Sequence, residues 1–171
     1  MYSVGDKIVY GESGVCTVES IGPLEISGAP KDRLYYSLRP LVGSGTYFTP
    51  VDSGVFMRPV MSRAEAEALI DAMPGIEPAL CNDSRFNHVD AFYKELFRRH
   101  SCEALVSILK GLHCRMSERK TKSSRVEATM KRARDMLHGE LSVALDLDMG
   151  EVESYINSRI GSLDEYSASS Q

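Results

Sequence analysis

Two histidines and two cysteines near the middle of the chain could act together: His100, Cys102, His113 and Cys114. Imidazole and thiolate groups are the usual ligands of structural zinc, which takes four of them. If residues 100–116 form a helix, His100 and Cys102 point about 200° apart, because each residue turns the helix by ~100°. His113 and Cys114 are adjacent and also diverge. The spacing therefore predicts thiols and a solvated histidine instead of a metal site.

The sequence carries no motif typical of an enzyme. It has no HExxH, no GxxxxGK[ST] loop, no dinucleotide glycine fingerprint and no Ser-His-Asp order. Glu151 and Glu153 are two apart on a predicted helix, so they face different ways. The four cysteines form no CxxC pair, which is typical of reduced thiols in a reducing compartment. We therefore expect a protein that binds, with no catalytic residue, metal or cofactor.

Basic residues are concentrated in one stretch of an acidic chain. The net charge is −4, but residues 98–134 hold eleven basic residues against three acids, and the residues from 135 onward hold eight acids against one arginine. The basic residues are Arg98, Arg99, Lys110, Arg115, Arg119, Lys120, Lys122, Arg125, Lys131, Arg132 and Arg134. A surface of one sign is what binds a polyanion. The stretch predicts a nucleic-acid contact, and the alternative is a solvated helix surface.

Bulk composition predicts a folded protein of one or two domains. The chain has 171 residues, of which 43% are hydrophobic and 26% charged. No run approaches the roughly 20 apolar residues that span a bilayer, and the first ten residues lack a signal-peptide pattern. We expect a cytoplasmic protein with no membrane contact.

The first sixty residues are typical of short strands. The runs DKIVY, GVCTVESI, RLYYSLRP, GTYFTPV and GVFMRPV are rich in β-branched or aromatic residues. Turn-forming stretches separate them: GESG, SGAPKD, VGSG and DSG. Five short strands at this spacing favour a small antiparallel β-barrel or a strongly bent sheet.

From Ser62 onward the pattern is helical. SRAE is a capping box that begins a helix at Ser62, and Pro74-Gly75 ends it. The linker PGIEPALCNDS precedes four amphipathic helices, the last of which begins at Asp148. The fold class is thus α+β. The expected parts are a β-barrel at 1–60, a connecting helix at 61–75, a linker at 76–84, an all-α helical domain at 85–160 and a flexible tail at 161–171.

The ordered set of segments resembles the CarD family of bacterial transcription regulators. VGDKIVYGESGVCTVESI is similar to the family's opening strand pair, YYSL to its third strand, and TPVDSGVFMRPVMSRAEAEALI to its Pro-Val-Asp, Arg-Pro and following helix. SCEALVSILKGLHCRMSERK and MKRARDMLHGELSVAL resemble its two longest helices. The resemblance covers residues 2–160, and the N-terminal module is shared with the polymerase-interacting domain of transcription-repair coupling factor.

The resemblance implies a fold and a binding role. It implies a Tudor-like barrel that docks on the RNA polymerase β subunit, and a helical domain that lies on promoter DNA at the upstream edge of the transcription bubble. In the family, a tryptophan there wedges into the minor groove and slows bubble collapse. A monomer would fit the family.

The wedge position departs from the family. Its tryptophan lies in a stretch like NDSRFN, but this chain has no tryptophan, and Asp83 or a neighbour such as Cys81 falls at that place. A ring inserted between base steps costs on the order of a few kcal/mol and is repaid by holding a distorted duplex. Aspartate cannot insert, and phosphates repel it. The wedge is therefore expected to be absent or transferred; Phe86, the nearest aromatic, lies on an apolar helical face and is expected in the core.

The polymerase-binding positions also differ. Where some members use arginines, this chain has Leu24 and Phe48, and the resemblance implies a docking set of Leu24, Ile26, Tyr47, Phe48 and Thr49. Interface cores favour aromatic and aliphatic anchors over charge, so such docking would be less sensitive to salt. The alternative is that Leu24 and Phe48 fill the barrel. Strand alternation places Tyr47 and Thr49 on one face and Phe48 on the other, so only one of the two aromatics need be buried.

Without the wedge, basic residues are the remaining candidates for binding DNA. The candidates are Arg85, Arg115, Arg119, Lys120, Lys122 and Arg125, around the turn between two long helices and at the start of the helical domain. Without base-edge readers, such residues bind phosphate in a salt-dependent, weakly sequence-selective way. The sequence thus predicts a regulator that binds polymerase and promoter DNA and modulates open-complex stability. The alternative is a polymerase-binding interaction protein that has lost the wedge and does not stabilise the bubble.

Overall fold

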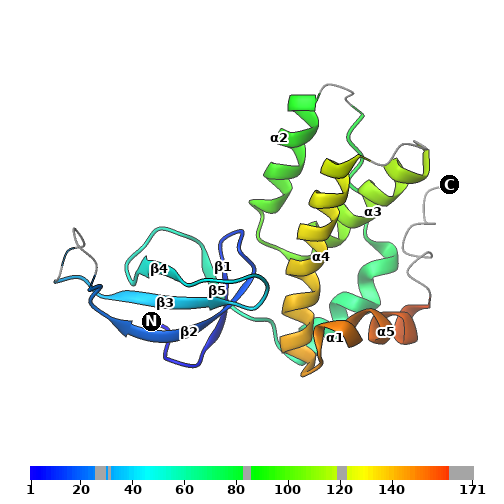
Figure 1. The fold of residues 1–171 in the computed structure, drawn as a ribbon. Helices are drawn as coiled ribbons and strands as arrows, with labels where there is room; N and C mark the ends of the chain where they lie inside the picture. The colour runs from blue at the N-terminus through cyan, green and yellow to red at the C-terminus, as the bar shows by residue number, and fades with distance from the viewer. Residues whose placement is uncertain (26–29, 31, 83–85, 119–122, 162–171) are drawn as a thin grey trace. The chain divides into compact units, whose positions relative to one another are not determined.

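The chain divides into two compact units, Met1–Val60 and Met61–Gln171, in a computed structural model (Figure 1). The structure describes the chain except residues 26–29, 31, 83–85, 119–122 and 162–171. Each unit has its own buried cluster of hydrophobic side chains. The two units are therefore described one at a time.

The first unit is a five-stranded antiparallel sheet. Its strands are β1 (Lys7–Tyr10), β2 (Val15–Gly22), β3 (Tyr35–Pro40), β4 (Tyr47–Pro50) and β5 (Met57–Pro59), in the order β4-β3-β2-β1-β5. The turn from β1 to β2 uses Gly11 and Gly14, whose φ values of 48° and 77° favour glycine. The α+β fold class is confirmed, since five strands precede the helices.

The sheet curls, but hydrogen bonds do not close it into a barrel. Among the described residues β4 and β5 are the two edges, with no ladder between them. The strands β1 and β4 are separated by β2 and β3 in the sheet, yet the rings of Tyr10 and Tyr47 lie 5.9 Å apart, centroid to centroid. The curled interior holds a small core of Ile8, Cys16, Val18, Tyr36 and Leu38.

The second unit is helical. Its helices are α1 (Arg63–Ala72), the short 3-10 helix η1 (Met73–Gly75), α2 (Phe86–Phe97), α3 (Cys102–Glu118), α4 (Ser124–Leu145) and α5 (Met149–Ile160). The predicted capping box is present at α1, with Ser62 and Glu65. The predicted start of the last helix at Asp148 is confirmed, and Asp148 and Glu151 form a second capping box there. No helix in the described part of the chain is long and apolar enough to cross a bilayer.

The helix α1, predicted as a connection, packs into the helical unit against α4 and α5. Its Ala66 and Ile70 are buried in the main hydrophobic cluster. On its other side Asp71 accepts hydrogen bonds from Arg159 of α5, at 2.6 Å from Nε and 2.8 Å from Nη2. This paired geometry orients α5 and holds the pKa of Asp71 below its usual value.

The predicted linker after α1 is extended and lies along α3. The backbone N–H of Ala79 donates to the carbonyl of Ser107 at 2.8 Å, and the Ser107 hydroxyl donates to the carbonyl of Glu77 at 2.6 Å. The phenol of Tyr93 on α2 donates to the Ala79 carbonyl at 3.5 Å. These bonds satisfy backbone groups of a segment that has no helix or strand of its own, and they fix the course of the chain between Glu77 and Ala79.

Candidate protein and nucleic-acid interfaces

The edge strand β4 carries two exposed aromatic side chains. Tyr47 is 41% exposed and Phe48 is 47% exposed. The register with β3 pairs Phe48 with Ser37, and Tyr47 with the buried Leu38. The predicted alternation thus holds for the backbone, because Phe48 points to the outer face and Tyr47 to the inner one. Neither aromatic is buried, however, since Tyr47 lies at the open end of the sheet and covers Tyr10.

Thr49 does not offer its side chain to a partner. It pairs with the buried Tyr36 and is 2% exposed. The predicted inclusion of Thr49 in a docking surface is corrected in this respect: its inward register position, next to the tyrosine that fills the sheet interior, buries it. Tyr47 and Phe48 are the members of the predicted set that stand at the surface of β4.

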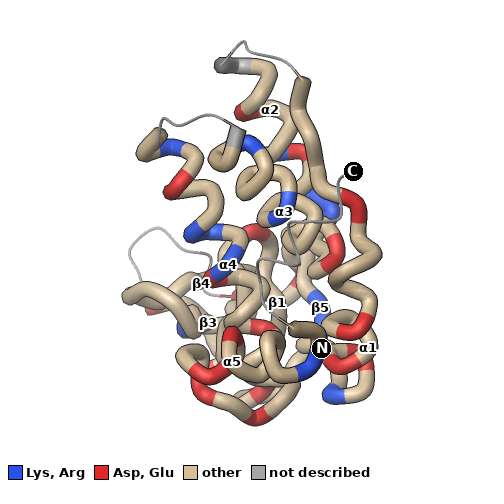
Figure 2. Tube along the Cα trace, turned by 90° about the vertical axis from the view of Figure 1, so that its right-hand side faces the viewer, with Lys and Arg blue, Asp and Glu red and all other residues tan. Residues whose placement is uncertain are grey.

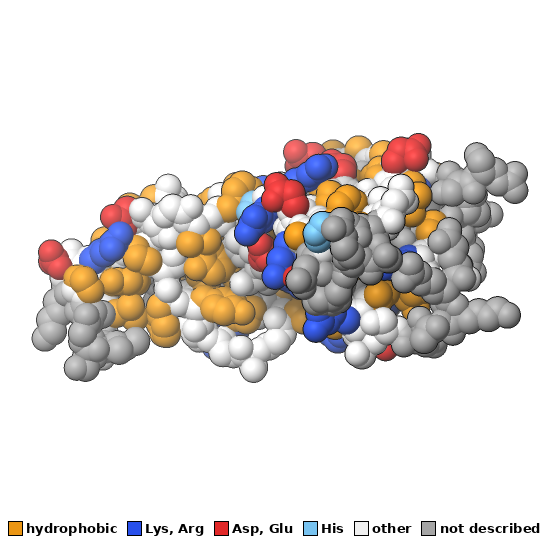
Figure 3. Space-filling view, turned by 90° about the horizontal axis from the view of Figure 1, so that it is seen from above, with side chains coloured by type: hydrophobic (Ala, Val, Ile, Leu, Met, Phe, Trp, Pro, Cys, Tyr) orange, Lys and Arg blue, Asp and Glu red, His pale blue; other side chains and the backbone are white. Residues whose placement is uncertain are grey.

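Leu24 follows the end of β2 and is half-buried. Ile26 lies outside the described residues. Further apolar side chains are exposed on the same unit, and Figure 3 shows hydrophobic atoms gathered on the face in view. They are Met1, Val4, Leu34, Leu41, Val42, Val55 and Phe56.

Lys110, one of the eleven residues of the basic stretch, is not part of a charged surface. It is 2% exposed, and its ammonium group donates to the carbonyls of Met73 at 3.3 Å, Pro74 at 3.1 Å and Ile76 at 2.6 Å. These carbonyls end α1 and η1, so Lys110 satisfies backbone acceptors that the helices leave open. Burial lowers the pKa of Lys110, against the nearby carboxylate of Glu77.

Of the other ten, Arg98 and Arg99 follow the end of α2, Arg115 lies on α3, and four lie on α4, namely Arg125, Lys131, Arg132 and Arg134. Figure 2 shows blue segments along the tubes of α3 and α4, and red segments gathered at α1 and α5. Arg125 is exposed at the start of α4, and Arg115 near the end of α3 is half-buried, donating to the carbonyl of Cys81 at 3.5 Å. The other DNA candidates, Arg85, Arg119, Lys120 and Lys122, lie outside the described residues.

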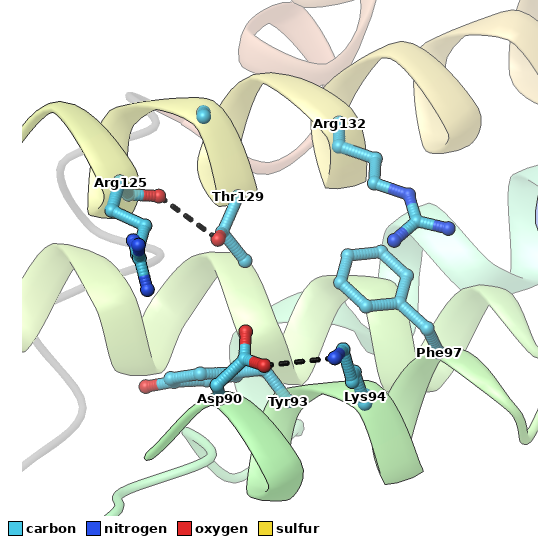
Figure 4. Close-up of a pocket in the computed structure, with 8 residues that line it drawn as sticks. Asp90, Tyr93, Lys94, Phe97, Arg125, Thr129 and Arg132 are labelled. Atoms are coloured by element: carbon cyan, nitrogen blue, oxygen red, sulfur yellow. Dashed lines mark hydrogen bonds and ion pairs between the residues drawn. The ribbon is translucent and has the colours of Figure 1, made fainter. Parts of the chain in front are cut away.

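A groove of about 190 Å³ lies between α2 and α4 (Figure 4). Residues from both helices line it: Asp90, Tyr93, Lys94 and Phe97 from α2, and Arg125, Ala128, Thr129 and Arg132 from α4. Lys94 pairs with Asp90 at 2.9 Å, and the guanidinium carbon of Arg132 lies 4.4 Å from the centre of the Phe97 ring. The lining holds three cations and one carboxylate, so it favours anions.

Comparison with protein families matches the first unit. Residues 2–61 fit the family described as CarD-like/TRCF RID domain. Residues 2–61 are therefore similar to a CarD-like/TRCF RID domain, and the first unit is called the RID domain from here on. The matched range covers all five strands, and the predicted likeness to the CarD family is consistent with it. A comparison with curated proteins gave no significant match for the chain.

The exposed aromatic residues of β4, Tyr47 and Phe48, lie within the range that matches the RID family. The match ends before α1, and the helical unit lies outside it. The DNA-binding residues therefore remain a prediction. They rest on charge and on the resemblance described above.

The predicted wedge position, Asp83, lies outside the described residues. The chain just before it is held in place: Ala79 is buried, and the carbonyl of Cys81 accepts a hydrogen bond from Arg115.

Among the described residues, no three His, Cys, Asp or Glu side chains lie close enough together to bind a metal ion. Cys16 lies in the core of the RID domain, where burial raises its pKa to about 11 and keeps it a thiol.

The groove between α2 and α4 was not predicted from the sequence. Arg125 and Arg132 belong to the basic stretch, but Lys94, which lines the groove with them, lies before the stretch begins. A signal was available. Intervals of four and then three residues separate Arg125, Thr129 and Arg132. The same intervals separate Asp90, Lys94 and Phe97, so each set lies on one face of its helix. Which two faces meet is set by tertiary packing.

Proposed function

We infer that this protein is a non-catalytic transcription regulator that binds the β subunit of RNA polymerase through its RID domain. The observation that carries the inference is the family match over residues 2–61, on a unit whose edge strand exposes Tyr47 and Phe48. Aromatic side chains are enriched at the centres of protein interfaces, where they bury a large area at little cost in conformational entropy. Such a regulator acts as a monomer in the cytoplasm, where polymerase is.

The position of β4 also supports docking. No described strand pairs with its outer edge, so backbone groups on that side can bond to a partner strand. Phe48 on the outer face would supply side-chain contact beside these backbone bonds. Because the contact is apolar and not built on arginines, polymerase binding should change little with salt concentration.

Promoter DNA is the proposed partner of the helical unit. The cations of α3 and α4 and of the turn between them, Arg115, Arg119, Lys120, Lys122 and Arg125, would meet backbone phosphates, with Arg85 at the start of the unit. Contacts of this kind fix position and carry little sequence choice. Each phosphate contact adds roughly 0.9 to the slope of log affinity against log salt, so DNA binding should weaken steeply as salt rises. The protein would thereby modulate the stability of the open complex.

A second candidate function follows from the wedge position. The chain has no tryptophan, and Asp83 carries a charge that phosphates repel. In this reading the RID domain binds polymerase, but the helical unit neither inserts between base pairs nor lengthens the life of the bubble.

One pair of measurements tests both functions. The full chain is bound to the purified polymerase β lobe at two salt concentrations, and open-complex lifetime is then measured with and without the protein. We expect binding that is insensitive to salt. No binding above background would overturn both functions. A changed lifetime supports the first function, and an unchanged lifetime with intact polymerase binding supports the second.

A further inference from the structure

We propose that Glu140 of α4 is an internal anchor that fixes the start of the helical unit at Met61, so that this unit moves relative to the RID domain about Val60. The boundary of the two compact units falls between Val60 and Met61. The proposal goes beyond the proposed function, because it concerns the free chain and does not depend on what either unit binds.

Glu140 is a buried carboxylate with a hydrogen bond at each oxygen. It is 2% exposed. Its Oε1 accepts from the backbone N–H of Met61 at 3.0 Å, and its Oε2 accepts from the thiol of Cys102 at 3.1 Å. Cys102 is the first residue of α3 and is also buried. Both oxygens act as acceptors, which is what an ionised carboxyl group offers, and bonds to such a group are stronger than those between neutral groups. Glu140 thus ties Met61 and the start of α3 to α4.

Met61 is held by its side chain as well as by its backbone. The side chain packs against the main hydrophobic cluster of the helical unit. The next residue, Ser62, caps α1, and its own N–H donates to Glu65 at 2.7 Å. Figure 1 shows the C-terminal part of α4, which carries Glu140, beside α1. The chain is therefore fixed to the helical unit from Met61 through α1.

On the other side of the boundary, the chain is fixed by β5. Pro59, the last residue of β5, pairs with Ile8 of β1, and its ring fixes its own φ. Val60 stands between Pro59 and Met61. A hinge is a short stretch next to fixed elements that takes up changes in φ and ψ. Val60 has this position, so a change in the orientation of the helical unit takes place in the backbone dihedrals around it.

Amide hydrogen exchange and ¹⁵N relaxation of the full-length chain test the anchor. In the wild type, we expect the Met61 amide to be protected and fast backbone motion to be centred on Val60. Glu140→Ala removes the acceptor, so exchange at Met61 should become faster by about tenfold or more, as for the loss of one hydrogen bond to a charged group. Fast motion should then extend from Val60 to Ser62. An unprotected Met61 amide in the wild type would overturn the proposal, and so would exchange at Met61 that Glu140→Ala leaves unchanged.

Two further variants separate the anchor from the hinge. Glu140→Gln keeps an oxygen that can accept from Met61, so it should retain most of the protection that Glu140→Ala loses. Val60→Gly makes the hinge more flexible and leaves the anchor in place, so motion should increase at position 60 while exchange at Met61 stays the same. Equal loss of protection in Glu140→Gln and Glu140→Ala would contradict the anchor. Motion that spreads to Met61 in Val60→Gly would contradict it too.

Exchange at Leu141 is the internal control for stability, because this residue of α4 is fully buried and its amide reports opening of the helical unit as a whole. If Glu140→Ala speeds exchange at Leu141 and Met61 equally, the variant has lost global stability, and Glu140→Gln and Val60→Gly decide the question. Failure of the chain to bind polymerase or DNA would remove the proposed function and leave these measurements unaffected, since they are made without a partner.

Discussion

Gly111 of α3 and Ala79 of the preceding extended segment touch so closely that no side chain fits between them. A Cβ at position 111 would collide with the carbonyl oxygen of Ala79 and lie 2.6 Å from its carbonyl carbon. The glycine therefore lets the extended segment lie directly on α3, where the N–H of Ala79 reaches the carbonyl of Ser107. This contact fixes the chain at Ala79, four residues before the predicted wedge position at Asp83.

Gly111→Ala should destabilise the helical unit by about 1–3 kcal/mol or more, because the methyl group forces backbone apart in a packed region. Urea unfolding of the full chain measures the change. Gly150→Ala is the control: Gly150 is also helical, has no atom within 4 Å of a built Cβ, and should be neutral or stabilising by up to about 1 kcal/mol. Equal stability of the two variants would show that the segment can move away from α3.

His138 on α4 should make stability depend on pH. It is buried, and burial followed by the charge of Arg134 lowers its pKa from 6.5, although Glu153 and Asp135 act in the opposite direction. Below 6.5 the unfolded chain binds a proton more readily than the folded one, so stability falls as the pH falls through the folded pKa. The free energy of unfolding of wild type should thus drop more between pH 7.5 and 5.5 than that of His138→Gln. Parallel pH profiles would contradict this.

Reversal of the three charges in the turn between α3 and α4 should weaken DNA binding at low salt. The variant is Arg119→Glu, Lys120→Glu and Lys122→Glu, with binding to a duplex measured by fluorescence anisotropy. Each lost phosphate contact should lower the salt slope by roughly 0.9, with helicity by circular dichroism retained. Lys7→Glu, exposed on the RID domain, controls for net charge and should have little effect. Unchanged affinity in the triple variant would identify the turn as a solvated surface.

Asp83→Trp should restore the missing wedge. If position 83 is equivalent to the tryptophan of the family, the ring inserts between base steps and holds the melted duplex, so open-complex lifetime increases over wild type. Asp83→Ala removes the charge without adding a ring, and separates relief of repulsion from insertion. A lifetime unchanged by the tryptophan would mean that the position does not reach the minor groove.

Local patterns allowed much of the fold to be predicted. The five strands, the capping box at Ser62, the start of the last helix at Asp148 and the α+β class follow from short-range signals such as turn residues and helix periodicity, and the structure contains them. Closure of the sheet was not predictable in this way. The sheet closes only if β4 forms hydrogen bonds with β5, and this depends on how strongly the sheet curls. The curl brings the ring of Tyr10 to the ring of Tyr47, but no ladder joins β4 and β5 in the described residues.

The sites were harder to predict, because burial is a property of packing. Lysine is usually a surface residue, yet Lys110 is buried in the helical unit. Its ammonium group donates to the carbonyl of Ile76, just after η1. Thr49 and Tyr47 share a face in the sequence pattern, but one lies over Tyr36 and the other at the open end of the sheet. The groove between α2 and α4 required knowledge of which helix faces meet. These are long-range contacts, and single-residue patterns do not encode them directly.

The central claim is that the exposed edge of the RID domain contacts polymerase, and site-specific crosslinking from position 48 tests it most directly. A photoreactive phenylalanine analogue replaces Phe48, with the same analogue at Phe56 as the control, an exposed aromatic next to the opposite edge strand, β5. On polymerase holoenzyme, we predict crosslinks from position 48 to the β subunit and few from position 56. Crosslinks from position 48 to another subunit, or none with polymerase present, would contradict the account.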